Sequence, residues 1–158
     1  MTLPLWLHGI IAFFTCLAFG VVFRVPKRAL LSCGIAGAAG WLAYGVALLY
    51  FNNVMISSLC GGFAVACIAE LSASVLRCPV TVFAVPGIIM LVPGLLAFDA
   101  MDAFLEGNYT AGLGMVIQTL FIAGAITTGL VLAGAIISGL RTSLRKKNVI
   151  IDEYQEED

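Results

Sequence analysis

Glu70 is the one acidic residue well inside an apolar stretch of this 158-residue chain. It precedes Arg77 by seven residues, which in a helix rising 1.5 Å per residue places it about 10 Å deeper than that cation. A carboxylate at the bilayer centre costs about 2.5–3.5 kcal/mol on insertion scales, and such groups usually face a protein interior or a wet path. We therefore expect Glu70 to carry a coupling proton or to meet a substrate ammonium. The alternative is a structural carboxyl held by a hydroxyl or a backbone group.

A doubled Pro-Gly pair is the second feature that could do chemistry. Pro86-Gly87 and Pro93-Gly94 interrupt the stretch PVTVFAVPGIIMLVPGLLAFD, residues 79–99, which is long enough to cross a bilayer. Each proline frees a carbonyl four residues earlier, and irregular backbone at membrane depth is tolerated only inside protein or beside a wet cavity. The pattern predicts breaks whose new helix N-termini, at the two glycines, favour an anion such as a carboxylate. A plain proline kink is the alternative.

Other polar side chains in the apolar runs are few and neutral. Gln118, Thr119 and Thr81 could orient a ligand, or they could join helices through hydrogen bonds worth about 0.6 kcal/mol each. With one histidine, no repeated acidic motif and no phosphate loop, the usual catalytic constellations are absent, so we expect neither an enzyme nor a cofactor. The five cysteines form no C-x-x-C pair, which predicts no disulfide and no metal site.

The composition predicts an all-α, polytopic membrane protein. Of its residues 61% are hydrophobic and 11% charged, and the mean hydropathy is +1.08, whereas soluble domains are about 45–50% apolar. Nothing in the charge distribution supports nucleic-acid binding. The first apolar run lacks a basic segment before it and a small-residue cleavage site, so we interpret it as a membrane span and not as a signal peptide.

We expect about five spans, the fourth broken by the paired Pro-Gly. Their predicted ranges are 3–23, 29–50, 54–76, 80–98 and 111–140, which gives a transmembrane domain over 1–147 and an acidic cytoplasmic tail over 148–158. With five spans all eight Lys and Arg residues fall on one side, which the positive-inside rule makes cytoplasmic. The N-terminus is therefore expected outside and the C-terminus inside.

Small residues recur at helix-packing spacing in the second and fifth runs, which allows backbones to approach closely. The sets are Gly34, Gly37 and Gly40; Ala125 with Gly129; and Ala135 with Gly139. We expect them to pack helices within the chain.

The run ELSASVLRCPVTVFAVPGIIMLVPG, together with the earlier VPKRALL and the later GNYTAG, resembles the threonine/serine exporter family. The resemblance is to the C-terminal membrane half of that family, occurring as a separate small subunit, and it extends from about Phe19 to Gly139. Its most specific part is the doubled Pro-Gly motif, in which Met90 stands where the family usually has a further proline. Glu70 and the two Pro-Gly pairs, Pro86-Gly87 and Pro93-Gly94, match the motif region position by position.

The resemblance implies an exporter of small carboxylates in a bacterial inner (plasma) membrane, acting on threonine and serine or on a dicarboxylate such as succinate. It also implies a partner membrane subunit equivalent to the family's N-terminal half. With Glu70 as the coupling group, transport would be driven by protons. Two alternatives stay open: an accessory or assembly subunit whose partner holds the translocation path, and a homo-oligomeric channel.

Overall fold

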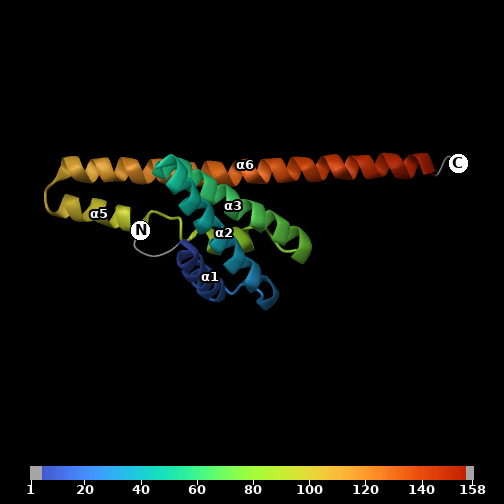
Figure 1. The fold of residues 1–158 in the computed structure, drawn as a ribbon, viewed down its shortest axis with the longest axis horizontal. Coiled ribbons are helices and arrows are strands. Elements are labelled where there is room, and N and C mark those ends of the chain that lie inside the picture. Colours follow the sequence, from blue (N-terminus) through green and yellow to red (C-terminus); the bar gives the residue numbers. More distant parts are fainter. Residues whose placement is uncertain (1–4, 156–158) are drawn as a thin grey trace.

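The all-helical prediction is confirmed. The computed structural model describes the backbone of residues 5–155 and the side chains of residues 5–140, and the described backbone forms six helices and no strand. The helices are α1 Leu5–Val22, α2 Lys27–Phe51, α3 Val54–Leu76, α4 Thr81–Ile88, α5 Gly94–Leu105 and α6 Tyr109–Gln155. Four are long and apolar enough to cross a membrane, namely α1, α2, α3 and the Tyr109–Leu140 part of α6. Figure 1 shows α6 as one long rod with the other helices gathered on one side of it.

Local residue chemistry explains the turn between α2 and α3. Asn52 ends α2 in the left-handed conformation, which asparagine tolerates better than most residues, and its N–H donates to the Leu48 carbonyl. The Asn53 side chain then caps α3 by accepting from the N–H groups of Met55 and Ile56, at 2.9 and 3.3 Å. These two asparagines therefore end α2 and begin α3.

The helix α3 lies between α2 and α6, and glycines bring all three close. A Cβ on Gly61 of α3 would lie 3.1 Å from the carbonyl oxygen of Gly40 of α2. On the other side of α3, a Cβ on Gly62 would lie only 2.6 Å from the carbonyl oxygen of Ile126 of α6. Because no side chain fits at these crossings, backbone approaches backbone.

The predicted packing role of small residues is confirmed for most of them. Gly34 and Gly37 face Phe13 and Cys16 of α1, and Gly129 faces the backbone of α3. Gly139 differs, because a Cβ there would meet open space.

The predicted fourth span is divided into two short helices, as its Pro-Gly content suggested, but the division falls at one pair only. The chain leaves helical structure at residues 89–93, and Pro93 caps α5. The predicted break at Pro86 is wrong, because Pro86 lies buried inside α4. The thiol of Cys33 donates to the Val82 carbonyl, the one that Pro86 deprives of its helical partner, over 3.4 Å.

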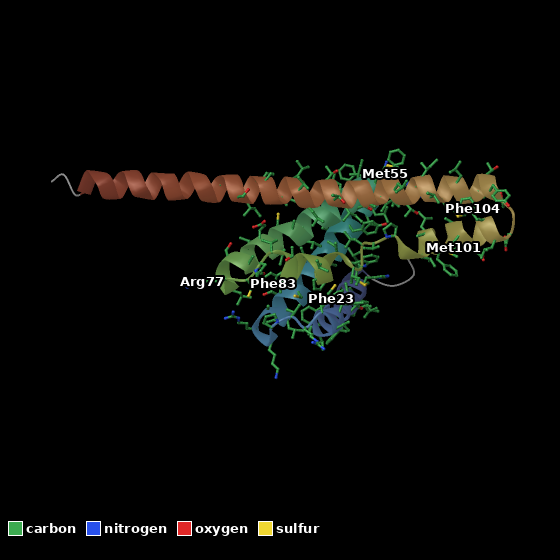
Figure 2. All side chains as sticks on the ribbon, turned by 180° about the vertical axis from the view of Figure 1, so that it is seen from behind. Phe23, Met55, Arg77, Phe83, Met101 and Phe104 are labelled. Carbon is green, nitrogen blue, oxygen red and sulfur yellow. The ribbon has the colours of Figure 1, made fainter. Side chains whose placement is uncertain are left out.

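The helix α5 runs antiparallel along the first part of α6, and the two form a hairpin (Figures 1 and 2). Among the described helices α5 packs against α6 alone. Its outward face is therefore apolar and exposed at Leu95, Phe98, Met101 and Leu105.

The last helix extends beyond the predicted fifth span. At 47 residues it would measure about 70 Å. The predicted acidic tail at 148–158 falls in this part, where the backbone is described as helix only to Gln155 and the side chains lie outside the described residues.

Candidate functional site

A cavity of about 410 Å³ lies at the break between α4 and α5. The unwound segment, the first turn of α5, and residues of α2, α3 and α6 form its wall. The lining residues are Trp41, Tyr44, Val54, Ser58, Met90, Leu91, Val92, Pro93, Gly94, Leu95, Leu96, Asp99 and Ile122. We refer to this cavity as the break pocket.

Leu91 fixes the unwound segment in place. Its side chain is 7% exposed and inserts where α2 and α3 cross, so that a Cβ on Gly40 would lie 3.5 Å from Leu91 Cδ1. Leu91 belongs to a core cluster with Val65, Ile122 and Ile126. The irregular backbone is therefore held by packing in protein, as irregular backbone at membrane depth must be.

Side chains that donate hydrogen bonds and side chains that accept them both line the break pocket. Trp41 and Tyr44 lie one turn apart on α2 with their rings stacked at 5.3 Å between centroids, and they bring an indole N–H and a phenol O–H. The buried Ser58 hydroxyl already donates to the Val54 carbonyl over 2.8 Å and can still accept a hydrogen bond. Asp99 supplies the one carboxylate of the lining. The pocket can thus receive donors and acceptors of one small polar molecule.

The first turn of α5 adds backbone donors. The Gly94 N–H is used, since it donates to the Val92 carbonyl over 2.8 Å, and the Ala97 N–H donates to the Pro93 carbonyl over 3.1 Å. The N–H groups of Leu95 and Leu96, between them, have no acceptor within their own helix. At a helix N-terminus such groups favour an anion.

The structure divides the predicted site residues into two groups. Pro93 and Gly94 line the break pocket as expected. Pro86 and Gly87 do not: both are buried in α4, where a Cβ on Gly87 would lie 2.8 Å from Val65 Cγ1. Gly87 lies in the last turn of α4, so the prediction that it opens a helix, with an anion at its N–H, is wrong.

Glu70 lies away from the break pocket. It is half-buried on α3 and faces α6, where a Cβ on Gly134 would lie 3.6 Å from its Oε1 atom. Ser74 donates over 2.8 Å to the backbone carbonyl of Glu70. Because Ser58 precedes Glu70 on the same helix by 12 residues, about 18 Å separates the carboxyl from the pocket wall. Glu70 is therefore too far from the break pocket to contact a molecule bound there.

Gln118 also lies outside the pocket lining. It is exposed on α6, one turn before the lining residue Ile122. Thr119 donates to the Met115 carbonyl over 2.8 Å, within its own helix. Neither residue joins two helices in this structure.

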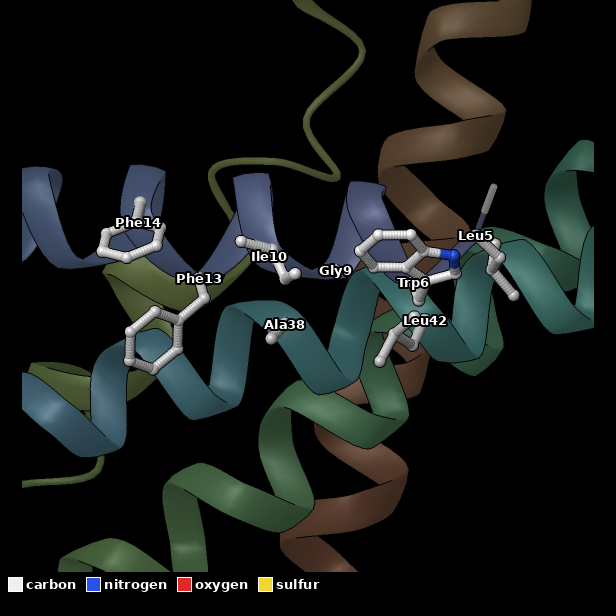
Figure 3. Close-up of a pocket in the computed structure, with 8 residues that line it drawn as sticks. All are labelled: Leu5, Trp6, Gly9, Ile10, Phe13, Phe14, Ala38 and Leu42. Atoms are coloured by element: carbon white, nitrogen blue, oxygen red, sulfur yellow. The ribbon is translucent and has the colours of Figure 1, made fainter. Parts of the chain in front are cut away.

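A second cavity, of about 780 Å³, is a different kind of surface. It lies between α1 and α2 and is lined by Leu5, Trp6, Gly9, Ile10, Phe13, Phe14, Ala38 and Leu42 (Figure 3). The indole nitrogen of Trp6 is the single polar side-chain atom in that set. A groove of this composition suits an acyl chain or another apolar helix, and it offers a polar metabolite almost no partners.

Sequence reasoning missed the four lining residues with polar side-chain atoms: Trp41, Tyr44, Ser58 and Asp99. Asp99 is the last residue of the stretch 79–99, and its place in the sequence alone assigns it no role. The aromatic pair was detectable in principle from its spacing of three residues, which places both rings on one helix face.

The helical fold, its four apolar helices and the pocket at an interrupted helix define a polytopic membrane protein of the transporter type. Residues 8–136 match the threonine/serine exporter family, ThrE. The chain belongs to that family, as its Pro-Gly motif indicated.

One relative is a protein of Haemophilus influenzae (strain ATCC 51907 / DSM 11121 / KW20 / Rd), described only as uncharacterized, and it is 32% identical over 129 residues. The match covers 73% of this chain and 42% of the relative, so the chain spans less than half of that protein's length. No solved structure matches.

Proposed function

We propose that this chain is one subunit of a proton-coupled secondary exporter of small carboxylate metabolites, and that the break pocket is its substrate site. The observation that carries the proposal is the pocket itself, where an unwound backbone, a helix N-terminus and a few polar side chains converge between apolar helices. Discontinuous helices build substrate sites in this way in secondary transporters.

The charge of the pocket favours an amino acid over a dicarboxylate. A carboxylate would accept from the N–H groups of Leu95 and Leu96 at the start of α5. Asp99, one turn further along, would then attract an ammonium and repel a second carboxylate. Threonine or serine satisfies both ends, whereas succinate places like charge against Asp99.

A partner membrane subunit is part of the proposal. The matched relative is more than twice as long as the region that it shares with this chain. The outward apolar face of α5, which packs only against α6, offers a surface for such a subunit. The orientation follows from the basic residues, with the N-terminus outside and the C-terminus in the cytoplasm of a bacterial inner membrane.

Glu70 is the proposed coupling group, acting at a distance from the substrate. Its position between α3 and α6 makes it a charge whose protonation would alter the packing of these two helices. Replacing Glu70 with glutamine keeps the size of the side chain and removes its acidic group. If Glu70→Gln left proton-driven efflux unchanged in vesicles containing the full complex, the coupling role would be wrong.

Reconstitution tests the exporter itself. This chain, its neighbouring membrane partner and the two together are placed in vesicles, and efflux of labelled threonine and of labelled succinate is followed with and without a pH gradient. The proposal predicts efflux only from vesicles holding both chains, faster for threonine and dependent on the gradient. Efflux by the partner alone would identify this chain as an accessory subunit. Gradient-independent flux through this chain alone would identify a channel.

A further inference from the structure

A second polar groove lies at the opposite end of α3, far from the break pocket. It runs between the start of α2 and the end of α3, has a volume of about 280 Å³ and is partly open to the surroundings. Its lining residues are Arg28, Leu31, Ser32, Leu71, Ser72 and Val75, with Leu76. We call it the α2–α3 groove.

The polarity of the groove changes along its length. Arg28, in the first turn of α2, stands at the mouth beside the α3–α4 connection, with its Nη2 atom 3.9 Å from the sulfur of Cys78. The contact is long and weak, and a guanidinium has five N–H donors, so most of them are available to a ligand. Further along, Leu31, Leu71 and Val75 are 62%, 58% and 81% exposed. A charged mouth therefore leads onto an open apolar surface.

Two hydroxyls that line this groove, those of Ser32 and Ser72, have no hydrogen-bond partner among the described residues. In the described part of the chain, most mid-helix serines and threonines donate to their own helix; Ser58 and Thr128, for example, donate to the carbonyl four residues earlier, over 2.8 Å each. Among the described residues, no hydrogen bond reaches the hydroxyl of Ser32 or Ser72. A hydroxyl at the edge of a bilayer that bonds to nothing in its own helix needs a polar partner from outside.

The start of α2 also suits an anion and not a cation. Its first turn contains no acidic residue, and Pro26 at its N-cap makes no side-chain hydrogen bond. A helix N-terminus disfavours a lysine or arginine and favours a phosphate. Arg28 therefore does not stabilise its own helix. An anion lying between Arg28 and the start of α2 would pair with the guanidinium and accept hydrogen bonds from the first N–H groups of the helix.

We propose that the α2–α3 groove binds an anionic phospholipid, with its phosphate on Arg28 and the two serine hydroxyls and an acyl chain on Leu31, Leu71 and Val75. Basic pockets between transmembrane helices on the cytoplasmic side bind anionic headgroups. The exposed apolar surface formed by Leu31, Leu71 and Val75 favours a lipid over a free phosphate, because a soluble anion gains nothing from contact with apolar side chains.

Native mass spectrometry of the purified full chain tests the proposal. The first bound lipid is compared between phosphatidylglycerol and phosphatidylcholine carrying the same acyl chains. We expect Arg28→Gln to lower the preference for phosphatidylglycerol by about fivefold or more. The matched control is Lys27→Gln, which removes an equal charge one residue away that does not line the groove; we expect about a twofold effect or less. The double variant Ser32→Ala, Ser72→Ala should also lower the preference.

Three results would overturn the assignment. Equal effects of Arg28→Gln and Lys27→Gln would mean diffuse attraction between a basic face and anionic lipid. An equal preference for both lipids in the native chain would remove the site. Displacement of the bound lipid by excess inorganic phosphate would make the ligand a free anion. The serine variant keeps the test decisive if Arg28→Gln folds poorly, because it changes only two hydroxyls.

Discussion

Replacing Gly129 with alanine is expected to separate α3 from α6 and lower the stability of the fold. A Cβ on Gly129 would clash with the carbonyl oxygen of Leu59 and lie 2.8 Å from the backbone nitrogen of Phe63. Both are backbone atoms in the middle of a helix, so neither can rotate aside. The two helices must therefore move apart. The displacement also affects the break pocket, because α3 supplies Val54 and Ser58 to its lining.

The magnitude follows from two opposing effects. Overpacking a tight contact costs about 1–3 kcal/mol, while alanine gains up to about 1 kcal/mol over glycine in a helix. Gly124 provides the matched control, since it lies on the same helix and a Cβ there meets nothing within 4 Å. Because helix propensity is common to both variants, Gly129→Ala should be less stable than Gly124→Ala by about 1–3 kcal/mol.

Reversible unfolding in mixed detergent micelles, followed by circular dichroism, measures this difference. Equal stability of the two variants, within about 0.5 kcal/mol, would refute the claim that glycine sets the distance between α3 and α6. A lower stability of Gly124→Ala would contradict it more strongly.

Two further predictions concern single side chains. Cys33→Ala should lower the free energy of unfolding by about 1 kcal/mol in the same assay, because it leaves the Val82 carbonyl without the donor that replaces the missing Pro86 N–H; Cys33→Ser should retain most of the stability, and an equal loss in both variants would show that packing matters here and not the hydrogen bond. Asp99→Asn should raise the KM for threonine about tenfold in reconstituted vesicles. Charge-assisted hydrogen bonds contribute about 1.5–3 kcal/mol, and because Asp99 is exposed, its contribution to binding should fall at the lower end of that range. Succinate efflux by Asp99→Asn should stay equal or increase, and a parallel loss for both substrates would contradict the assigned role of Asp99.

Much of the fold could be predicted because a bilayer restricts the structures available to an apolar chain. Long apolar runs at residues 3–23 and 54–76 become helices that end where polar or turn-forming residues begin. The two asparagines at 52 and 53 mark a turn by their side-chain chemistry alone. These signals are local, so one sequence is enough to read them.

The position of the helix break could not be predicted from the residue types. Pro86 and Pro93 each lack an N–H, yet Pro86 stays in a helix, where Cys33 of α2 donates to the freed carbonyl of Val82, 49 residues later in the sequence. Leu91 inserts between two glycines and holds the other break open. Both outcomes depend on contacts between distant segments, which the spacing of prolines does not encode.

The candidate site was half predicted for the same reason. Pro93 and Gly94 were identified by local chemistry. Tyr44 of α2 and Asp99 of α5 join them only because the unwound segment brings both beside one pocket. Glu70 is recognisable in the sequence as an unusual charge in an apolar run, but its distance from the pocket depends on the direction in which α3 runs.

The central claim is that substrate binds in the break pocket, and filling that pocket tests it most directly. A Cβ on Gly94 meets nothing within 4 Å although Gly94 lines the pocket, so leucine can occupy the space without displacing the backbone. Gly114 of α6 is equally open, does not line the pocket and serves as the control. In vesicles containing the full complex, the account predicts that Gly94→Leu abolishes threonine efflux while Gly114→Leu keeps it. Undiminished efflux by a well-folded Gly94→Leu complex would contradict the assignment of this pocket as the substrate site.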